Sequence, residues 1–91
     1  MIKFTRINND TNGNPRYVCH FLSFIKPGET FENVPPWDIS GKYDIALSRS
    51  RQFGGRKFHN KQYGGGIVFQ SYNIDDLGER IEKFVAELSN S

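Results

Sequence analysis

The side chains best suited to binding a charged partner are concentrated between residues 49 and 66. Cationic side chains there can pair with phosphates or carboxylates, and aromatic rings offer flat faces for stacking. Five glycines among the thirteen residues 54–66 cost more chain entropy than turns alone require. We therefore expect a binding surface, and its candidate residues are Arg49, Arg51, Arg56, Lys57, Phe58, His59, Lys61 and Tyr63.

The charge of the chain is distributed unevenly, although the net charge is only +2. Residues 1–44 carry five basic and five acidic side chains, whereas residues 45–74 carry five basic and no acidic ones. Residues 75–91 then hold five acidic side chains against two basic ones. This asymmetry suits an oppositely charged partner, which would be nucleic acid or an acidic protein face for the basic segment. Pairing of the two segments between copies in a homodimer is a further alternative.

The basic stretch also has a purely structural interpretation. In that interpretation it is a solvated hairpin whose glycines serve only turn geometry, while Phe58 and Tyr63 pack into the core. The carboxylates of the C-terminal segment have a similar ordinary explanation, as the solvated face of a helix whose dipole favours acids in its first turn. The sequence leaves these interpretations open.

Known phosphate-binding and nucleic-acid motifs do not fit the stretch. Residues 65–72 lack the leading basic residue and the aromatic placement of an RNP1 motif. A phosphate loop or a dinucleotide fingerprint needs its glycines to open a helix, whereas residues 64–66 lead into an apolar run typical of a strand. Nucleic-acid binding therefore rests on charge and aromatic content alone.

Three residues could act as a nucleophile, a base or a soft metal ligand: Cys19, His20 and His59. Cys19 and His20 are adjacent in a predicted strand and would point to opposite faces of the sheet. Three candidates also fall short of a four-ligand structural zinc site. We therefore expect no catalytic residue, no metal and no cofactor, and we interpret the protein as non-enzymatic.

The N-terminal half predicts two strands and a loop. Residues 2–7 alternate like a strand, and Asn12-Gly13 is a strong hairpin signal. Residues 16–25 are apolar on both alternating faces, which is typical of a central strand. The proline-rich loop that follows contains Trp37, a large side chain that we expect to fold onto the core.

The C-terminal half predicts two helices and at least one strand. A helix capped by Asp38 or Ser40 should run to about residue 53 and end at Gly54 in the left-handed conformation. Residues 57–63 form either a short strand or an ordered loop, and residues 67–72 form a clear strand. A final helix follows Asn73 as N-cap, with Tyr72 packed on Leu77 and Gly78 permitting close approach to the sheet. Its apolar stripe is Ile74, Leu77, Ile81, Phe84, Val85 and Leu88.

These elements predict a single α+β domain over residues 1–91. The order is β-β-α-(β)-β-α, with a mainly antiparallel sheet of three to four strands and both helices on one face. No run approaches the ~18 apolar residues of a membrane span, and no signal peptide is apparent. One unpaired cysteine suits a reducing compartment, so we expect a cytoplasmic protein with no membrane partner.

Two segments carry a resemblance to known proteins. Residues 12–18 (NGNPRYV) and residues 65–73 (GGIVFQSYN) together look like segments of small proteins from phages and other mobile elements. The resemblance implies an inhibitor or adaptor that docks on a host protein or nucleoprotein complex, such as a defence complex. Direct binding of single-stranded DNA or RNA by the same basic stretch is the alternative. Neither the identity of the partner nor the oligomeric state follows from the sequence.

Overall fold

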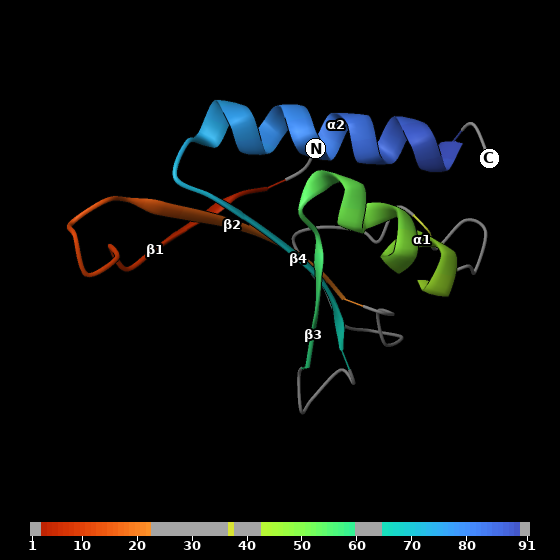
Figure 1. Cartoon of the computed structure of the whole chain (residues 1–91), viewed down its shortest axis with the longest axis horizontal. Helices are drawn as coiled ribbons and strands as arrows, with labels where there is room; N and C mark the ends of the chain where they lie inside the picture. Colours follow the sequence, from red (N-terminus) through yellow and green to blue (C-terminus); the bar gives the residue numbers. More distant parts are fainter. Residues whose placement is uncertain (1–2, 23–36, 38–42, 60–64, 90–91) are drawn as a thin grey trace.

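The chain folds into one antiparallel sheet with two helices, seen in a computed structural model that describes residues 3–22, 37, 43–59 and 65–89. The sheet order is β1-β2-β4-β3, and every described strand pair is antiparallel (Figure 1). This confirms the predicted α+β class and the order β-β-α-β-β-α. The elements are β1 (Thr5–Ile7), β2 (Arg16–Leu22), α1 (Tyr43–Ser50), the short 3₁₀ helix η1 (Arg51–Phe53), β3 (Arg56–Phe58), β4 (Gly66–Ser71) and α2 (Ile74–Ser89).

The turn between β1 and β2 is organised by the carboxylate of Asp10. Its Oδ1 accepts hydrogen bonds from the backbone N–H groups of Asn12 and Asn14, both at 2.9 Å. Gly13 adopts φ 83°, a left-handed conformation that glycine reaches without steric cost because it has no Cβ. β1 and β2 pair antiparallel on either side of residues 8–15, which confirms the predicted hairpin, although Gly13 alone of the Asn12-Gly13 pair has a positive φ. The backbone N–H donors lower the pKa of Asp10.

Strand β2 is central and buried on both faces, as its composition predicts. Cys19 and Phe21 lie opposite Phe69 and Ile67 of β4, on the face that packs against the helices. Val18 and Leu22 point to the other face and are also buried. Trp37 is 2% exposed and packs edge-on against Phe21, which confirms that it belongs to the core. Residues 23–25 of the predicted strand lie outside the described residues.

Both helices bury their apolar stripes against the same face of the sheet (Figure 1). In α1 the buried residues are Ala46 and Ser50, and Tyr43 and Leu47 pack at the margin of the core. The predicted helix continues to Phe53 only as the 3₁₀ turn η1, and Gly54 ends it at φ 84°, as expected. The predicted start of this helix, at residue 38 or 40, lies outside the described residues.

Helix α2 starts as the sequence predicts. The Asn73 side chain accepts hydrogen bonds from the backbone N–H groups of Asp75 (2.8 Å) and Asp76 (3.2 Å), which is the geometry of an N-cap. Leu77, Ile81 and Phe84 are fully buried, and Val85 and Leu88 pack against the core.

Two expectations about the first turns of α2 are wrong. Ile74 is 44% exposed, so it lies outside the core. Tyr72 is 55% exposed, and its packing on Leu77 stays a prediction. A Cβ on Gly78 would meet only the ring of Phe4, at 3.8 and 3.9 Å, which is ordinary van der Waals contact. Close approach of the helix to the sheet therefore does not require glycine at position 78.

Candidate binding surface

Two glycines between η1 and β3 place the basic residues at the edge of the sheet. Gly54 reverses the chain at φ 84°, and the Gly55 N–H donates to the Ser50 carbonyl at 2.8 Å. A Cβ on Gly55 would lie 2.6 Å from the Ser50 hydroxyl oxygen and 3.0 Å from the Phe69 ring. Gly55 is therefore needed for packing rather than for flexibility. The tight reversal starts β3 at Arg56, directly beside the end of α1.

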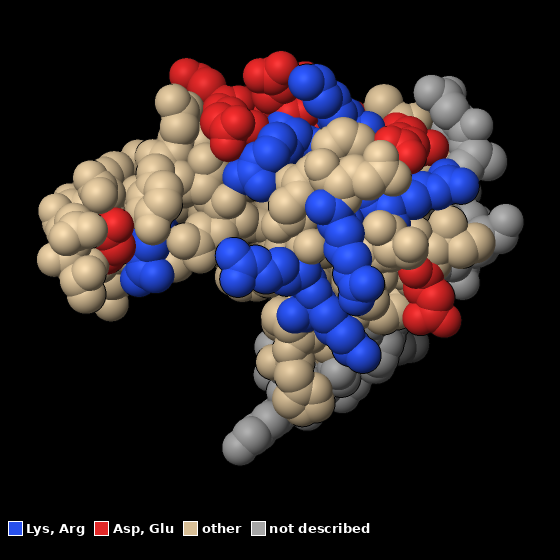
Figure 2. All heavy atoms as spheres, viewed as in Figure 1, with Lys and Arg blue, Asp and Glu red and all other residues tan. Residues whose placement is uncertain are grey.

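The cations of this segment that face solvent are Arg51, Arg56 and Lys57. Arg56 and Lys57 pair with Val68 and Ile67 of β4, so their side chains leave opposite faces of the edge strand β3. Figure 2 shows Lys and Arg side chains gathered over β3 and α1, with Asp and Glu side chains along α2. With the part of the chain that the structure describes, these three side chains form no ion pair or hydrogen bond. We call Arg51, Arg56 and Lys57 the basic surface.

Arg49 is less accessible to a partner than its position in the chain suggests. It is half-buried, and its guanidinium donates a long hydrogen bond of 3.5 Å to the Glu87 carbonyl of α2. The neighbouring Gln52 amide reaches the Glu87 carboxylate at 3.4 Å. Arg49 therefore helps to join α1 to α2.

Phe58 is committed to the sheet. Its ring lies edge-on to His20, with centroids 5.2 Å apart, and covers Gly66, where a Cβ would lie only 2.6 Å from it. An aromatic ring over a strand glycine fills space that no side chain occupies. Burial lowers the pKa of His20 in this contact. Phe58 is thus half-buried rather than a free stacking face, whereas His59 is exposed. Lys61, Tyr63 and the rest of 60–64 lie outside the described residues, so the choice between strand and loop is answered only for Arg56–Phe58.

The chemistry of Cys19 is that of a core residue. Its side chain is 1% exposed, and burial raises the pKa of the thiol to about 12 from an ordinary value of 9.0. A protonated, enclosed thiol is not a nucleophile at neutral pH. Cys19 and His20 point to opposite faces of β2, as expected.

Sequence reasoning missed Arg80, which holds the surroundings of the basic surface together. Its guanidinium donates to the Phe53 carbonyl at 2.8 Å and to the Gln70 carbonyl, and it pairs with Asp76 at 3.1 Å. Asp76 in turn accepts a 2.8 Å hydrogen bond from the Ser71 hydroxyl. Only the i,i+4 spacing of Asp76 and Arg80 was readable in the sequence, because the two carbonyl contacts depend on the tertiary fold.

The described residues offer neither a metal-binding cluster nor a membrane-spanning helix. Among the described residues, no group of three or more His, Cys, Asp and Glu side chains is placed to hold a metal ion. Neither α1 nor α2, the helices that the structure describes, has the length and apolar composition of a bilayer-spanning segment.

The fold and its surface define a small α+β domain that displays exposed cations at one edge of its sheet. Comparison with known proteins adds its origin. The chain belongs to the family of the Staphylococcus phage terminal repeat-encoded protein TreK, whose family model matches residues 1–90. The resemblance to small phage proteins is therefore confirmed. No curated protein and no solved structure matches the chain.

Proposed function

We propose that this phage protein is a non-enzymatic binding protein that docks on a host protein or nucleoprotein complex and inhibits or adapts it. The basic surface is the part that makes the contact, and an acidic protein face or a protein-bound nucleic acid is the complementary ligand. Such a protein acts in the cytoplasm of the infected cell, and a defence complex is one candidate target.

The main support for this proposal is the exposure of Arg51, Arg56 and Lys57 around the tight turn at Gly54 and Gly55. The turn at Gly54 and Gly55 holds the backbone that carries these cations in one conformation. The backbone therefore loses less conformational entropy when a partner binds. Exposed cations that form no ion pair with the described residues also steer an acidic partner at long range. The buried, protonated thiol of Cys19 supports a non-enzymatic role.

The structure offers one competing explanation for the same cations. Strand β3 lies at the end of the sheet order, and charged residues on an edge strand prevent edge-to-edge aggregation. This explanation accounts for Arg56 and Lys57. It does not account for Arg51, which lies in η1 before the strand begins.

The test compares Lys57→Glu with Lys83→Glu. The two substitutions change the charge equally, and Lys83 is an exposed lysine of α2 (62% exposed) outside the basic surface. Each protein is immobilised and exposed to lysate of a staphylococcal host, with and without nuclease treatment, and the captured proteins are identified. We expect Lys57→Glu to lose a partner that the unaltered protein and Lys83→Glu both retain. Equal capture by all three would contradict the proposal, and aggregation of Lys57→Glu alone would favour edge protection.

Direct binding of single-stranded DNA or RNA is the second candidate function. The same exposed cations favour it, but single-strand binding draws much of its affinity from stacking on aromatic rings. The Phe58 ring already packs against His20 and Gly66. Titration of labelled DNA and RNA at low and high salt separates the two. Tight binding that weakens steeply with salt and is lost in Lys57→Glu would establish this alternative.

A further inference from the structure

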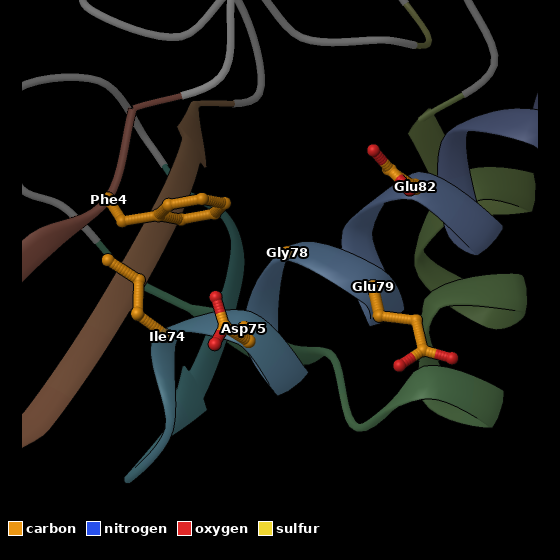
Figure 3. A pocket seen from close by; sticks show the side chains of 6 residues that line it. All are labelled: Phe4, Ile74, Asp75, Gly78, Glu79 and Glu82. Carbon is orange, nitrogen blue, oxygen red and sulfur yellow. The ribbon is translucent and has the colours of Figure 1, made fainter.

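A shallow hollow of about 420 Å³ lies between the residues that lead into β1 and the first turns of α2. It is lined by Phe4, Ile74, Asp75, Gly78, Glu79 and Glu82. Figure 3 shows the Phe4 ring beside the helix, with Ile74 and Asp75 at one end of the hollow, Glu82 at the other and Gly78 between them. The hollow therefore combines an apolar floor with an acidic rim.

The floor of the hollow is accessible. Ile74 is 44% exposed although it is a large aliphatic side chain, and Phe4 is only partly buried. Gly78 leaves open the space beside Phe4, because a Cβ at this position would meet nothing closer than the ring at 3.8 Å. An incoming side chain thus finds apolar surface on two sides.

The rim carries negative charge that the described residues compensate only in part. Asp75 and Glu82 are seven residues apart, about two helical turns or ~10 Å, on the same side of α2. Neither forms an ion pair with the described residues. Glu79 points away from Phe4 and pairs with Lys83 at 3.1 Å, but both side chains are more than 60% exposed, so water screens this pair.

The hollow is separate from the basic surface. At about 100° per residue, Gly78 and Arg80 point in nearly opposite directions from the axis of α2. Arg80 contacts Phe53 of η1 on one flank of the helix, whereas Gly78 faces Phe4 on the other. The protein therefore presents two surfaces of opposite charge on different sides of one helix.

We propose that this hollow binds an arginine side chain from a basic segment of a partner protein. The methylene groups and the flat face of the guanidinium would lie against Phe4 and Ile74, while its N–H groups donate to Asp75 and Glu82. Arginine fits better than lysine because its guanidinium is planar, weakly hydrated and able to stack on an aromatic ring while pairing with carboxylates. This contact goes beyond the proposed function, because it adds a second partner surface that does not use Arg51, Arg56 or Lys57.

The test is a titration followed by the backbone amide signals of the ¹⁵N-labelled protein. The probe is a capped glycine–arginine–glycine peptide, compared with the same peptide carrying citrulline, which keeps the shape and loses the charge, or lysine. We expect the arginine peptide to shift the amides of Asp75, Gly78 and Glu82 saturably and the citrulline peptide to leave them unchanged. Lysine should bind several-fold more weakly.

Two variant comparisons separate this site from general attraction to an acidic helix. Asp75→Asn should weaken binding about fivefold or more, whereas Asp44→Asn, the same substitution on α1, should have no effect. Gly78→Met keeps every carboxylate but fills the hollow with a flexible side chain that suits a helix. We expect it to weaken binding at least tenfold, with helix content unchanged in the circular dichroism spectrum.

Several results would overturn the proposal. They are an absence of saturable shifts up to the highest soluble peptide concentration, equal binding of the citrulline or lysine peptide, and unchanged binding by Gly78→Met. The same amides shifting with protein concentration alone, together with a dimer in sedimentation, would make a second copy of the chain the occupant instead. None of these measurements depends on the host partner of the basic surface, so this proposal and the proposed function can fail separately.

Discussion

The behaviour of Cys19 illustrates how a single residue type acquires its chemistry from burial. The thiol lies among Phe21, Phe69 and the helices, where the charged thiolate is poorly solvated and its pKa rises to about 12. We predict that native protein reacts with a thiol reagent at pH 8 at least ~100-fold more slowly than protein unfolded in urea, since reaction requires opening of the core. Equal rates would contradict the buried position.

The burial of Cys19 also predicts how the stability of the protein changes at alkaline pH. Above the ordinary thiol pKa of 9.0 the unfolded chain loses a proton that the folded protein keeps up to about 12. Stability is therefore unaffected by this thiol below pH 9 and falls as the pH rises from 9 towards 12. Tyr43 contributes with the same sign, because burial raises its pKa above 10.0. Urea unfolding at pH 8 and pH 10 should show a smaller loss for Cys19→Ala than for the unaltered protein.

At the scale of single residues, the sequence predicted correctly the features that depend only on neighbouring residues. The opposite orientations of Cys19 and His20 and the N-cap role of Asn73 follow from local periodicity and local hydrogen bonds. The position of Phe58 over Gly66 did not follow, because it depends on the register between β3 and β4. The contact of Arg49 with Glu87 did not follow either, since it crosses 38 residues of sequence.

At the scale of elements, two glycines should respond to alanine in opposite ways. Gly78 lies within α2 with room for a methyl group, so Gly78→Ala should raise the free energy of unfolding by roughly 1 kcal/mol through helix propensity. Gly66 lies in β4, where a Cβ would overlap the Phe21 carbonyl oxygen of β2 and the Phe58 ring. Gly66→Ala should lower the free energy of unfolding by roughly 3 kcal/mol, because backbone cannot move aside.

Urea denaturation of both variants checks this pair of predictions, with the unaltered protein as reference. If Gly78→Ala lowered the free energy of unfolding, the prediction would be contradicted, and α2 would need glycine at this position for close packing. The sequence alone could not separate the two positions. Both are glycines next to apolar residues, and only the β2–β4 register and the location of Phe4 show which one is crowded.

The whole molecule is an arrangement of two charged surfaces about α2. The uneven charge was visible in the sequence, and so were the fold class, the central position of β2 and the burial of Trp37. The acidic hollow was not predicted, because it combines α2 with Phe4, some 70 residues away in the chain. Its only sequence signal was Ile74 and Gly78 at helical spacing beside acids, which we interpreted as core.

Arg80 links α2 to η1 and β4, beside the turn that carries the basic surface, and its removal is the sharpest test of this part of the architecture. The Arg80 side chain is 24% exposed, and its guanidinium bridges α2 to η1 and β4 through the carbonyls of Phe53 and Gln70. Arg80→Met keeps most of the side-chain volume but leaves both carbonyls without this donor. Hydrogen bonds to charged groups contribute ~1.5–3 kcal/mol each, so we expect the free energy of unfolding to fall by about 2–4 kcal/mol.

Lys83→Met is the matched control for this prediction, because Lys83 lies one turn further along α2 and, among the described residues, pairs with Glu79 alone, at an exposed position. Its loss should change stability by less than ~0.5 kcal/mol. Arg80→Met should also loosen the turn at Gly54, so amide exchange should accelerate at residues 51–57 more than in the centre of β2. If the two variants were equally stable, Arg80 would be an ordinary surface cation, and the backbone that displays Arg51, Arg56 and Lys57 would owe its rigidity to the glycine turn alone.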